Sequence, residues 1–131
     1  DRVSDAKLED VTAAGTKTLD TKAMQESDSQ MIKRLYGLNP ADYAGIALYY
    51  PATNMDAEEL LIVQLKDVSQ QETVKAAIES RLETQKNSFE GYGMEQFALL
   101  EKSVVDVEGN YILFVVNEQA AKAQSAFLQA L

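Results

Sequence analysis

The sequence predicts a single α+β domain, residues 1–131, in which a four-stranded, mainly antiparallel sheet packs against helices. Three observations predict this class. The chain is 46% hydrophobic and 25% charged, which is the composition of an ordinary globular domain. Short apolar stretches alternate with longer amphipathic ones from residue 43 onward, in the order ββαββα. Most connections between successive strands are short enough to favour antiparallel pairing.

Two helices are expected before the first strand. Ser4 is placed to begin the first helix and Gly15 to end it, and residues 16–26 have no period and are interpreted as a connector. Residues 1–26 are therefore an N-terminal helix and connector, and 27–131 are the compact core. Ser27 begins the second helix with a capping box, and Gly37 ends it.

Two strands follow a tight turn in which Asn39 is able to cap. The first covers 43–50 and ends before Pro51, and the second covers 59–66. Both are apolar at odd and even positions, so we expect them to be buried on both faces of the sheet.

The second half repeats this plan. A long helix is predicted from Ser69 to Gly91, and residues 94–102 fit either a helical turn or the start of a strand. A strand over 103–108 with Val105 facing inward precedes a Gly109-Asn110 hairpin turn, in which both residues are expected to suit a positive φ.

The fourth strand covers 111–116, and Asn117 is expected to cap the last helix. We expect the helices that begin at Ser69 and Asn117 to cover one face of the sheet. The other face, which includes Leu113, must then be covered by the helices before residue 40 or by a second copy of the chain. Cover from within the chain is favoured, because a bare apolar face is larger than a monomer normally shows.

The residue inventory excludes several functions. The chain has no Cys and no His, which excludes thiolate nucleophiles, imidazole bases and Cys/His zinc sites. Its net charge of -9 and scattered basic residues oppose nucleic acid binding. No apolar run is long enough to span a bilayer, and no calcium or phosphate loop is present. We expect no metal site and no cofactor.

Carboxylates are the one catalytic device that this inventory leaves. They form two groups along the sequence: Asp56, Glu58 and Glu59, and Asp106, Glu108 and Glu118. A hydrolase of the glycosidase type needs two carboxyls across a cleft, one with a raised pKa. The alternative is that these groups are solvated.

Three tyrosines are the candidate binding residues. Tyr49 and Tyr50 end a strand, and Tyr92 lies in the loop after a helix. Tyrosines at such places can line a binding site, because the ring is apolar and the hydroxyl forms hydrogen bonds. The alternative is that they fill the rim of the core.

Three stretches carry a resemblance to a known family: RLYGLNPADY at 34–43, YYPATNMDAEELLIVQLKD at 49–67, and RLETQKNSFEGYGMEQFALLEKSVVDVEGNYILFVVNE at 81–118. Over residues 25–131 the chain resembles the domain of unknown function 4358, a family of small exported bacterial lipoproteins. Members are typically lipoproteins of Gram-positive anaerobes, anchored through a Cys that this chain lacks. The family brings no catalytic residues.

The resemblance implies an extracytoplasmic protein, held at the membrane by a lipid anchor that is missing from this chain. We therefore expect a non-enzymatic binding or interaction module of the cell envelope, whose partner is an envelope protein, a peptide or a glycan. A monomer is favoured over a homodimer. The alternatives are a self-associating structural or assembly protein and, more remotely, a carboxylate-dependent hydrolase.

Overall fold

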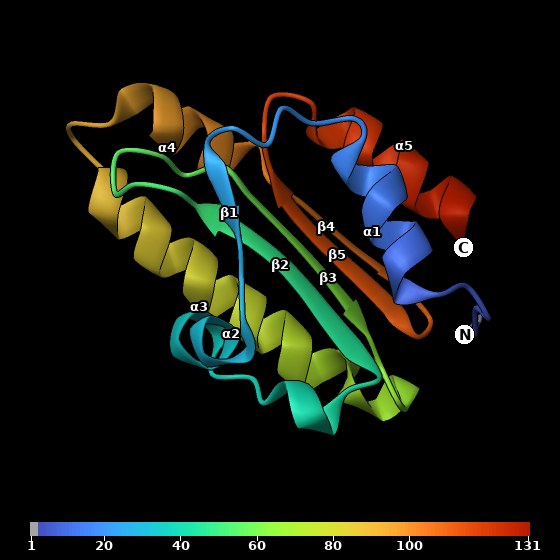
Figure 1. Ribbon diagram of the computed structural model, residues 1–131. Helices are drawn as coiled ribbons and strands as arrows, with labels where there is room; N and C mark the ends of the chain where they lie inside the picture. The colour runs from blue at the N-terminus through green and yellow to red at the C-terminus, as the bar shows by residue number, and fades with distance from the viewer. Residues whose placement is uncertain (1–2) are drawn as a thin grey trace.

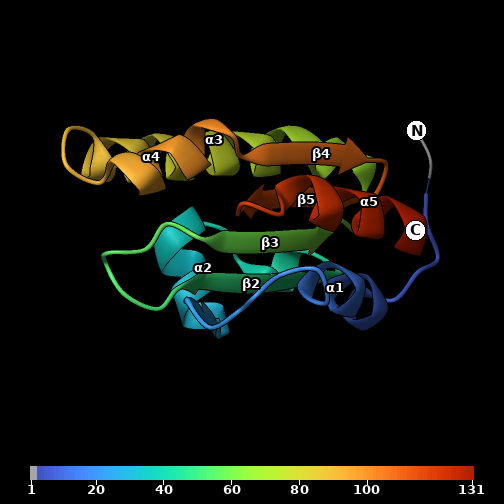
Figure 2. The same cartoon turned by 90° about the horizontal axis from the view of Figure 1, so that it is seen from above.

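A five-stranded antiparallel sheet forms the centre of the computed structural model, which describes residues 3–131. The strands lie in the order β1-β2-β3-β5-β4, with β3 in the middle (Figure 1). Their bounds are β1 Met24–Glu26, β2 Gly45–Pro51, β3 Glu59–Gln64, β4 Val104–Glu108 and β5 Tyr111–Val116. Figure 2 shows β2, β3, β5 and β4 in this sequence across the sheet. The predicted α+β class is confirmed, and the prediction of four strands is wrong.

The additional strand is β1, which lies within residues 16–26 and pairs with β2 so that Met24 faces Pro51. It has three residues, of which only Met24 is buried. A strand this short has no room to show an alternation, so the sequence pattern predicted a connector there.

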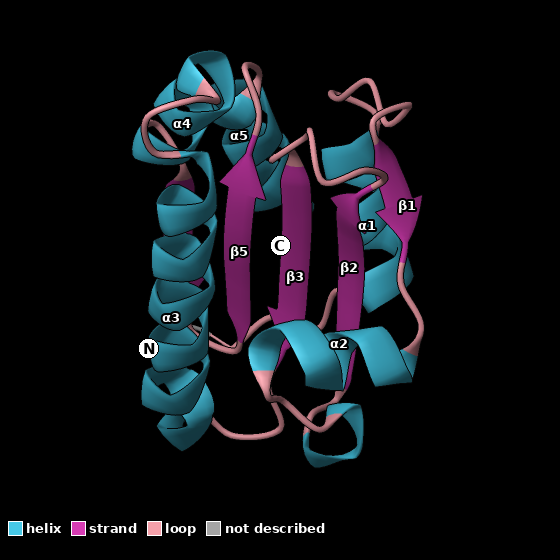
Figure 3. Ribbon diagram, turned by 90° about the vertical axis from the view of Figure 1, so that its left-hand side faces the viewer, coloured by secondary structure: helices cyan, strands magenta, loops and turns pink. Residues whose placement is uncertain are grey.

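Helices cover both faces of the sheet (Figure 3). Their bounds are α1 Leu8–Thr16, α2 Ser29–Tyr36, α3 Gln71–Phe89, α4 Met94–Glu101 and α5 Ala120–Ala130, with short 3-10 turns at Pro40–Asp42 and Val68–Gln70. The helices α2, α3 and α4 pack on the face that includes Leu61 and Phe114, and α1 and α5 pack on the face that includes Ile62 and Leu113. The predicted ββαββα order therefore needs one more helix, α4, in the region that the sequence left open.

The expectation that the helices after Ser69 and Asn117 share a face is wrong, because α3 and α5 lie on opposite faces. The question of what covers Leu113 is answered within the chain: Val11 of α1 and Phe127 of α5 pack there and are fully buried. Intramolecular cover is thus confirmed. Burial of both faces also explains why β3 and β5 are apolar at every position from Leu60 to Val63 and from Tyr111 to Val116.

The N-terminal segment is fastened to the β4–β5 turn. The backbone N–H of Ser4 donates to Oδ1 of Asn110 at 2.8 Å, and Nδ2 of Asn110 donates to the carbonyl of Ser4 at 3.1 Å. The hydroxyl of Tyr111 donates to the carbonyl of Ala6 at 2.7 Å. Ser4 is therefore not the helix cap that the sequence predicts; α1 begins only at Leu8.

The other helix ends and caps are close to the prediction. Gly37 ends α2 with φ of 67°, and Asn39 accepts a hydrogen bond from the N–H of Ala41. The caps of α2 and of the turn before α3 are Asp28 and Asp67, in place of the predicted Ser27 and Ser69.

The β4–β5 hairpin differs from prediction in two details. Gly109 has a positive φ of 58° and Asn110 does not, which is the combination expected of a type II′ turn. Val105, predicted to face inward, is 44% exposed, because β4 is the edge strand and has a neighbouring strand on one side only. Asp106, which the alternation places outward, is buried and accepts a hydrogen bond from Gln124 of α5.

Candidate functional site

A groove lies between α2, α3 and the β2–β3 loop, at the end of the sheet where β3 begins. We call it the tyrosine groove. Its volume is about 560 Å³. It is lined by Met31, Arg34, Leu35, Tyr50, Pro51, Ala52, Thr53, Asn54, Asp56, Arg81, Gln85, Ser88, Phe89 and Tyr92. Apolar side chains of α2 and α3 thus share the lining with two arginines and with the polar loop.

The structure brings together two of the three predicted tyrosines. Tyr50 is half-buried in the tyrosine groove, and Tyr92 lies at its rim with 72% of its surface exposed. Tyr49 packs on the opposite face, and burial, with the charge of Glu26, raises its pKa. Successive side chains of a strand point to opposite faces, so Tyr49 and Tyr50 cannot line one site.

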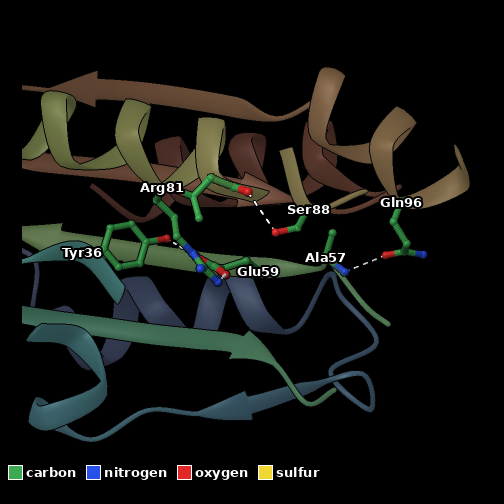
Figure 4. Close-up of polar contacts among 7 residues, drawn as sticks. Tyr36, Ala57, Glu59, Arg81, Ser88 and Gln96 are labelled. Carbon is green, nitrogen blue, oxygen red and sulfur yellow. Dashed lines mark hydrogen bonds and ion pairs between the residues drawn. The ribbon is translucent and has the colours of Figure 1, made fainter. Parts of the chain in front are cut away.

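A buried polar cluster lies beside this groove and joins α2, β3 and α3 (Figure 4). We call it the Tyr36–Glu59–Arg81 triad. Arg81 donates from Nη2 to Oε1 of Glu59 at 2.7 Å and from Nε to Oε2 at 3.1 Å. The hydroxyl of Tyr36 donates to Oε2 of Glu59, and the guanidinium lies 6.0 Å from the centre of the Tyr36 ring. Each carboxylate oxygen of Glu59 is therefore satisfied, although this residue is only 1% exposed.

Burial and charge fix the protonation of the triad. Burial raises the pKa of Tyr36 well above its ordinary value, and the adjacent charge of Glu59 raises it further. Burial alone would lower the pKa of Arg81, but the hydrogen bonds and charge of Glu59 outweigh it, so the pKa is raised. Tyr36 thus remains a donor and Arg81 remains charged, which suits a structural support for the groove better than an acid–base catalyst.

Sequence reasoning missed this triad, although its signal was present. Arg81 stands three residues after Ile78 and seven after Val74, so it occupies the buried stripe of α3. Glu59 begins a strand whose next four residues are all buried. An acid in an apolar strand and a base on an apolar helical stripe together predict a buried ion pair.

A second groove lies on the other side of the β2–β3 loop, next to α4 and the start of α5, with a volume of about 1030 Å³. We call it the acidic groove. The N–H of Ala57 in the loop donates to Oε1 of Gln96 in α4 at 2.7 Å, which holds the loop between the two grooves (Figure 4). The lining includes one basic residue and four acidic ones: Lys102, Asp20, Glu58, Glu95 and Glu118.

Burial raises the pKa of Glu58, and the charges of Asp56, Asp20 and Glu118 raise it further. Nδ2 of Asn117 donates to Oε2 of Glu58 at 2.8 Å. Among the six predicted carboxylates, Glu58 and Glu118 therefore line one groove. Across residues 3–131, no cluster of three or more acids is placed to hold a metal ion.

The other predicted carboxylates lie elsewhere. Asp56 lines the tyrosine groove and accepts a hydrogen bond from Thr53. Glu59 is held in the triad, and Asp106 is bound to Gln124. Glu108 ends β4, at the opposite end of the sheet from both grooves.

We expect Glu58→Gln to stabilise the protein at pH 7 by a few tenths of a kcal/mol, up to about 1 kcal/mol. A raised pKa means that the folded state holds the proton more tightly than the unfolded state does. The stability that this raised pKa contributes is present below the pKa of Glu58 in the unfolded state, about 4.3. It is lost as the pH rises through the pKa of Glu58 in the folded state. Glutamine keeps the acceptor for Asn117 and carries no charge. Urea unfolding at pH 4 and pH 7 measures the effect, which should shrink at pH 4.

The matched control is Glu83→Gln, on the exposed side of α3. It removes the same charge from an exposed side chain and should change stability at pH 7 by less than about 0.5 kcal/mol. An advantage of Glu58→Gln that is larger at pH 4 than at pH 7 contradicts the prediction.

One comparison with known proteins gives a match. A family model described as Domain of unknown function (DUF4358) matches residues 17–117. This range includes all five strands and the β2–β3 loop between the two grooves. No match was found among curated proteins or solved structures. Since the family model covers well over half of the chain, this protein belongs to the family described as Domain of unknown function (DUF4358).

Proposed function

We propose that this protein is a non-enzymatic binding module of the bacterial cell envelope and that its ligand occupies the tyrosine groove. The observation that carries the proposal is a single groove lined by the exposed ring of Tyr92, the exposed guanidinium of Arg34 and apolar side chains of α2 and α3. Tyrosine and arginine are the residue types that contribute most to binding energy at interfaces. A concavity in which apolar side chains and polar groups converge is also a usual place for a ligand.

The groove is supported by rigid elements. The triad joins α2 and β3 to α3 through charged hydrogen bonds, and Arg81 itself lines the groove. Phe89 of the same lining is buried and stacks beside Tyr92, with ring centres 6.3 Å apart. A site that is held in shape before binding loses less entropy when its ligand enters.

An extracytoplasmic location with a lipid anchor is part of the proposal, and it follows from the resemblance of residues 25–131 to a family of exported lipoproteins. Within residues 3–131, no helix is both long and apolar enough to cross a bilayer. The partner is an envelope protein, a peptide or a glycan. A monomer is favoured over the self-associating alternative, because α1 and α5 cover the sheet face that self-association was expected to use.

A carboxylate-dependent hydrolase is the second candidate, and the acidic groove favours it. Glu58, with its raised pKa, and Glu118 line this groove together, as a general acid and a second carboxylate would. Hydrolysis of a panel of chromogenic glycosides that is lost in both Glu58→Gln and Glu118→Gln, and kept in Glu83→Gln, would support this function.

Site-specific photocrosslinking tests the binding proposal. A benzophenone amino acid replaces Tyr92 in the lipid-anchored protein in bacterial cells, and the same group replaces Leu128 on α5 as a control. Both positions are exposed and lie on opposite faces of the sheet. We expect a discrete adduct at position 92 and none at 128, because only the first lies at the groove. Equal labelling at both positions, or none at position 92, contradicts the proposal.

A further inference from the structure

We infer that the ligand of the tyrosine groove is an acidic peptide segment of a partner protein, in which an apolar side chain stands next to a carboxylate. This inference rests on the proposed function and deepens it by naming the class of ligand. Three features carry it: the apolar side chains in the lining, the position of the charges, and two exposed methionines next to lining residues in the sequence.

The lining provides a place for an apolar anchor. Met31 and Leu35 come from α2, Phe89 from α3 and Tyr50 from β2, and all four lie on the face covered by α2 and α3. An anchor that leaves water for such a surface contributes about 25 cal/mol for each Å² of apolar area that it buries.

The charges favour a carboxylate beside that anchor. Arg34 lies in the last turn of α2 and is exposed to the groove. In the part of the chain that the structure describes, the ion pairs are Lys75–Glu72 and Arg81–Glu59, so the guanidinium of Arg34 is open to a ligand. Asp56, the acid of the lining, already accepts a hydrogen bond from Thr53. A guanidinium binds a carboxylate with two parallel hydrogen bonds.

The contrast with the acidic groove strengthens this assignment. Four carboxylates and one lysine line the acidic groove. The tyrosine groove is lined by one carboxylate and two arginines, of which Arg81 is already paired with Glu59. The net charge of -9 repels an acidic ligand at long range, but physiological salt screens charges beyond about 8 Å. At contact distance a carboxylate meets the open cation of Arg34 in the tyrosine groove, whereas four carboxylates repel it in the acidic groove, so the tyrosine groove is the better place for it.

Two exposed methionines close to lining residues in the sequence favour a peptide. Met55 stands between the lining residues Asn54 and Asp56, and Met94 stands two residues after Tyr92; both are strongly exposed. A thioether is an adaptable apolar group that suits the varied side chains of a peptide.

Peptide selection tests the inference. A library of random displayed peptides is selected on the wild-type protein, on Arg34→Glu and on Lys33→Glu. Lys33 is the matched control, because it is also exposed on α2 and does not line the groove. We expect the wild type and Lys33→Glu to select peptides with an apolar residue within two positions of Asp or Glu. Arg34→Glu should select Lys or Arg at that place and weaken a wild-type peptide by about tenfold.

The outcomes separate the two proposals. Peptides without a preference for acids, or a preference that Arg34→Glu leaves unchanged, overturn the inference. If no peptide binds but crosslinking at position 92 captures a glycan, the inference fails and the proposed function stands. If a selected peptide binds Tyr92→Ala as tightly as the wild type, the groove is not the site and both proposals fail. Circular dichroism confirms that each variant is folded.

Discussion

Replacement of Arg81 by methionine is expected to lower the free energy of unfolding by about 3 to 5 kcal/mol, because it leaves a buried carboxylate without its cation. Glu59 is 1% exposed and would retain only the hydroxyl of Tyr36. Methionine fills much of the volume of the arginine stem, so the loss reports on charge more than on packing. Urea unfolding at pH 7 measures the change.

Two further variants make this test specific. The triple variant Tyr36→Phe, Glu59→Leu and Arg81→Met removes every polar partner and should recover most of the lost stability, since an apolar cluster of similar volume often replaces a buried ion pair without cost. Lys75→Ala removes the exposed ion pair with Glu72 and should cost no more than about 1 kcal/mol. A loss below about 1 kcal/mol in the single variant Arg81→Met would show that Glu59 is not a buried carboxylate that depends on Arg81 as its cation.

Phe127→Ala is expected to destabilise the protein by about 3 to 5 kcal/mol. The ring is fully buried between α5 and the sheet and meets Tyr111 edge-on, with ring centres 6.3 Å apart. Its removal costs the transfer free energy of the ring and leaves a cavity on the face covered by α1 and α5. Chemical denaturation measures the loss.

The neighbouring residue supplies the control for this helix. Leu128→Ala changes a side chain that is 40% exposed and should cost less than about 1 kcal/mol. Equal effects at positions 127 and 128 would mean that α5 does not present the described side to the sheet.

The elements were predictable where the local signal was strong. β5 carries six consecutive buried apolar residues, and a strand buried on both faces is the simple interpretation of such a run. Gly37 was predictable as a helix end because a left-handed conformation suits glycine.

Cap residues and helix placement were less predictable. Ser27 stands beside Asp28, and both can accept a hydrogen bond from a helix N–H, so only the path of the backbone decides between them. The faces of α3 and α5 depend on how each helix leaves its strand, and an amphipathic stripe shows that a helix is buried without showing against which face.

The candidate site was predictable only in part, because it depends on contacts between elements that are far apart in the sequence. Tyr50 and Tyr92 meet at one groove because the fold brings α3 to the end of β2, and no local pattern records that approach. For the triad, the apolar surroundings of Glu59 and Arg81 in the sequence indicate a buried ion pair, but the contact with Tyr36 depends on how α2 packs. Strand geometry alone separates Tyr49 from Tyr50, and this part could have been stated from the sequence.

The hydrogen bonds between Ser4 and the β4–β5 turn set the orientation that the proposed lipid anchor would give the domain. That turn is at the end of the sheet where Gln64 pairs with Tyr111, and both grooves are at the end where Glu59 pairs with Val116. The six residues of β5 between them span about 20 Å. The lipid anchor proposed above would reach the domain through Ser4, so the tyrosine groove would lie at the end of the sheet that points away from the membrane, where a partner can reach it.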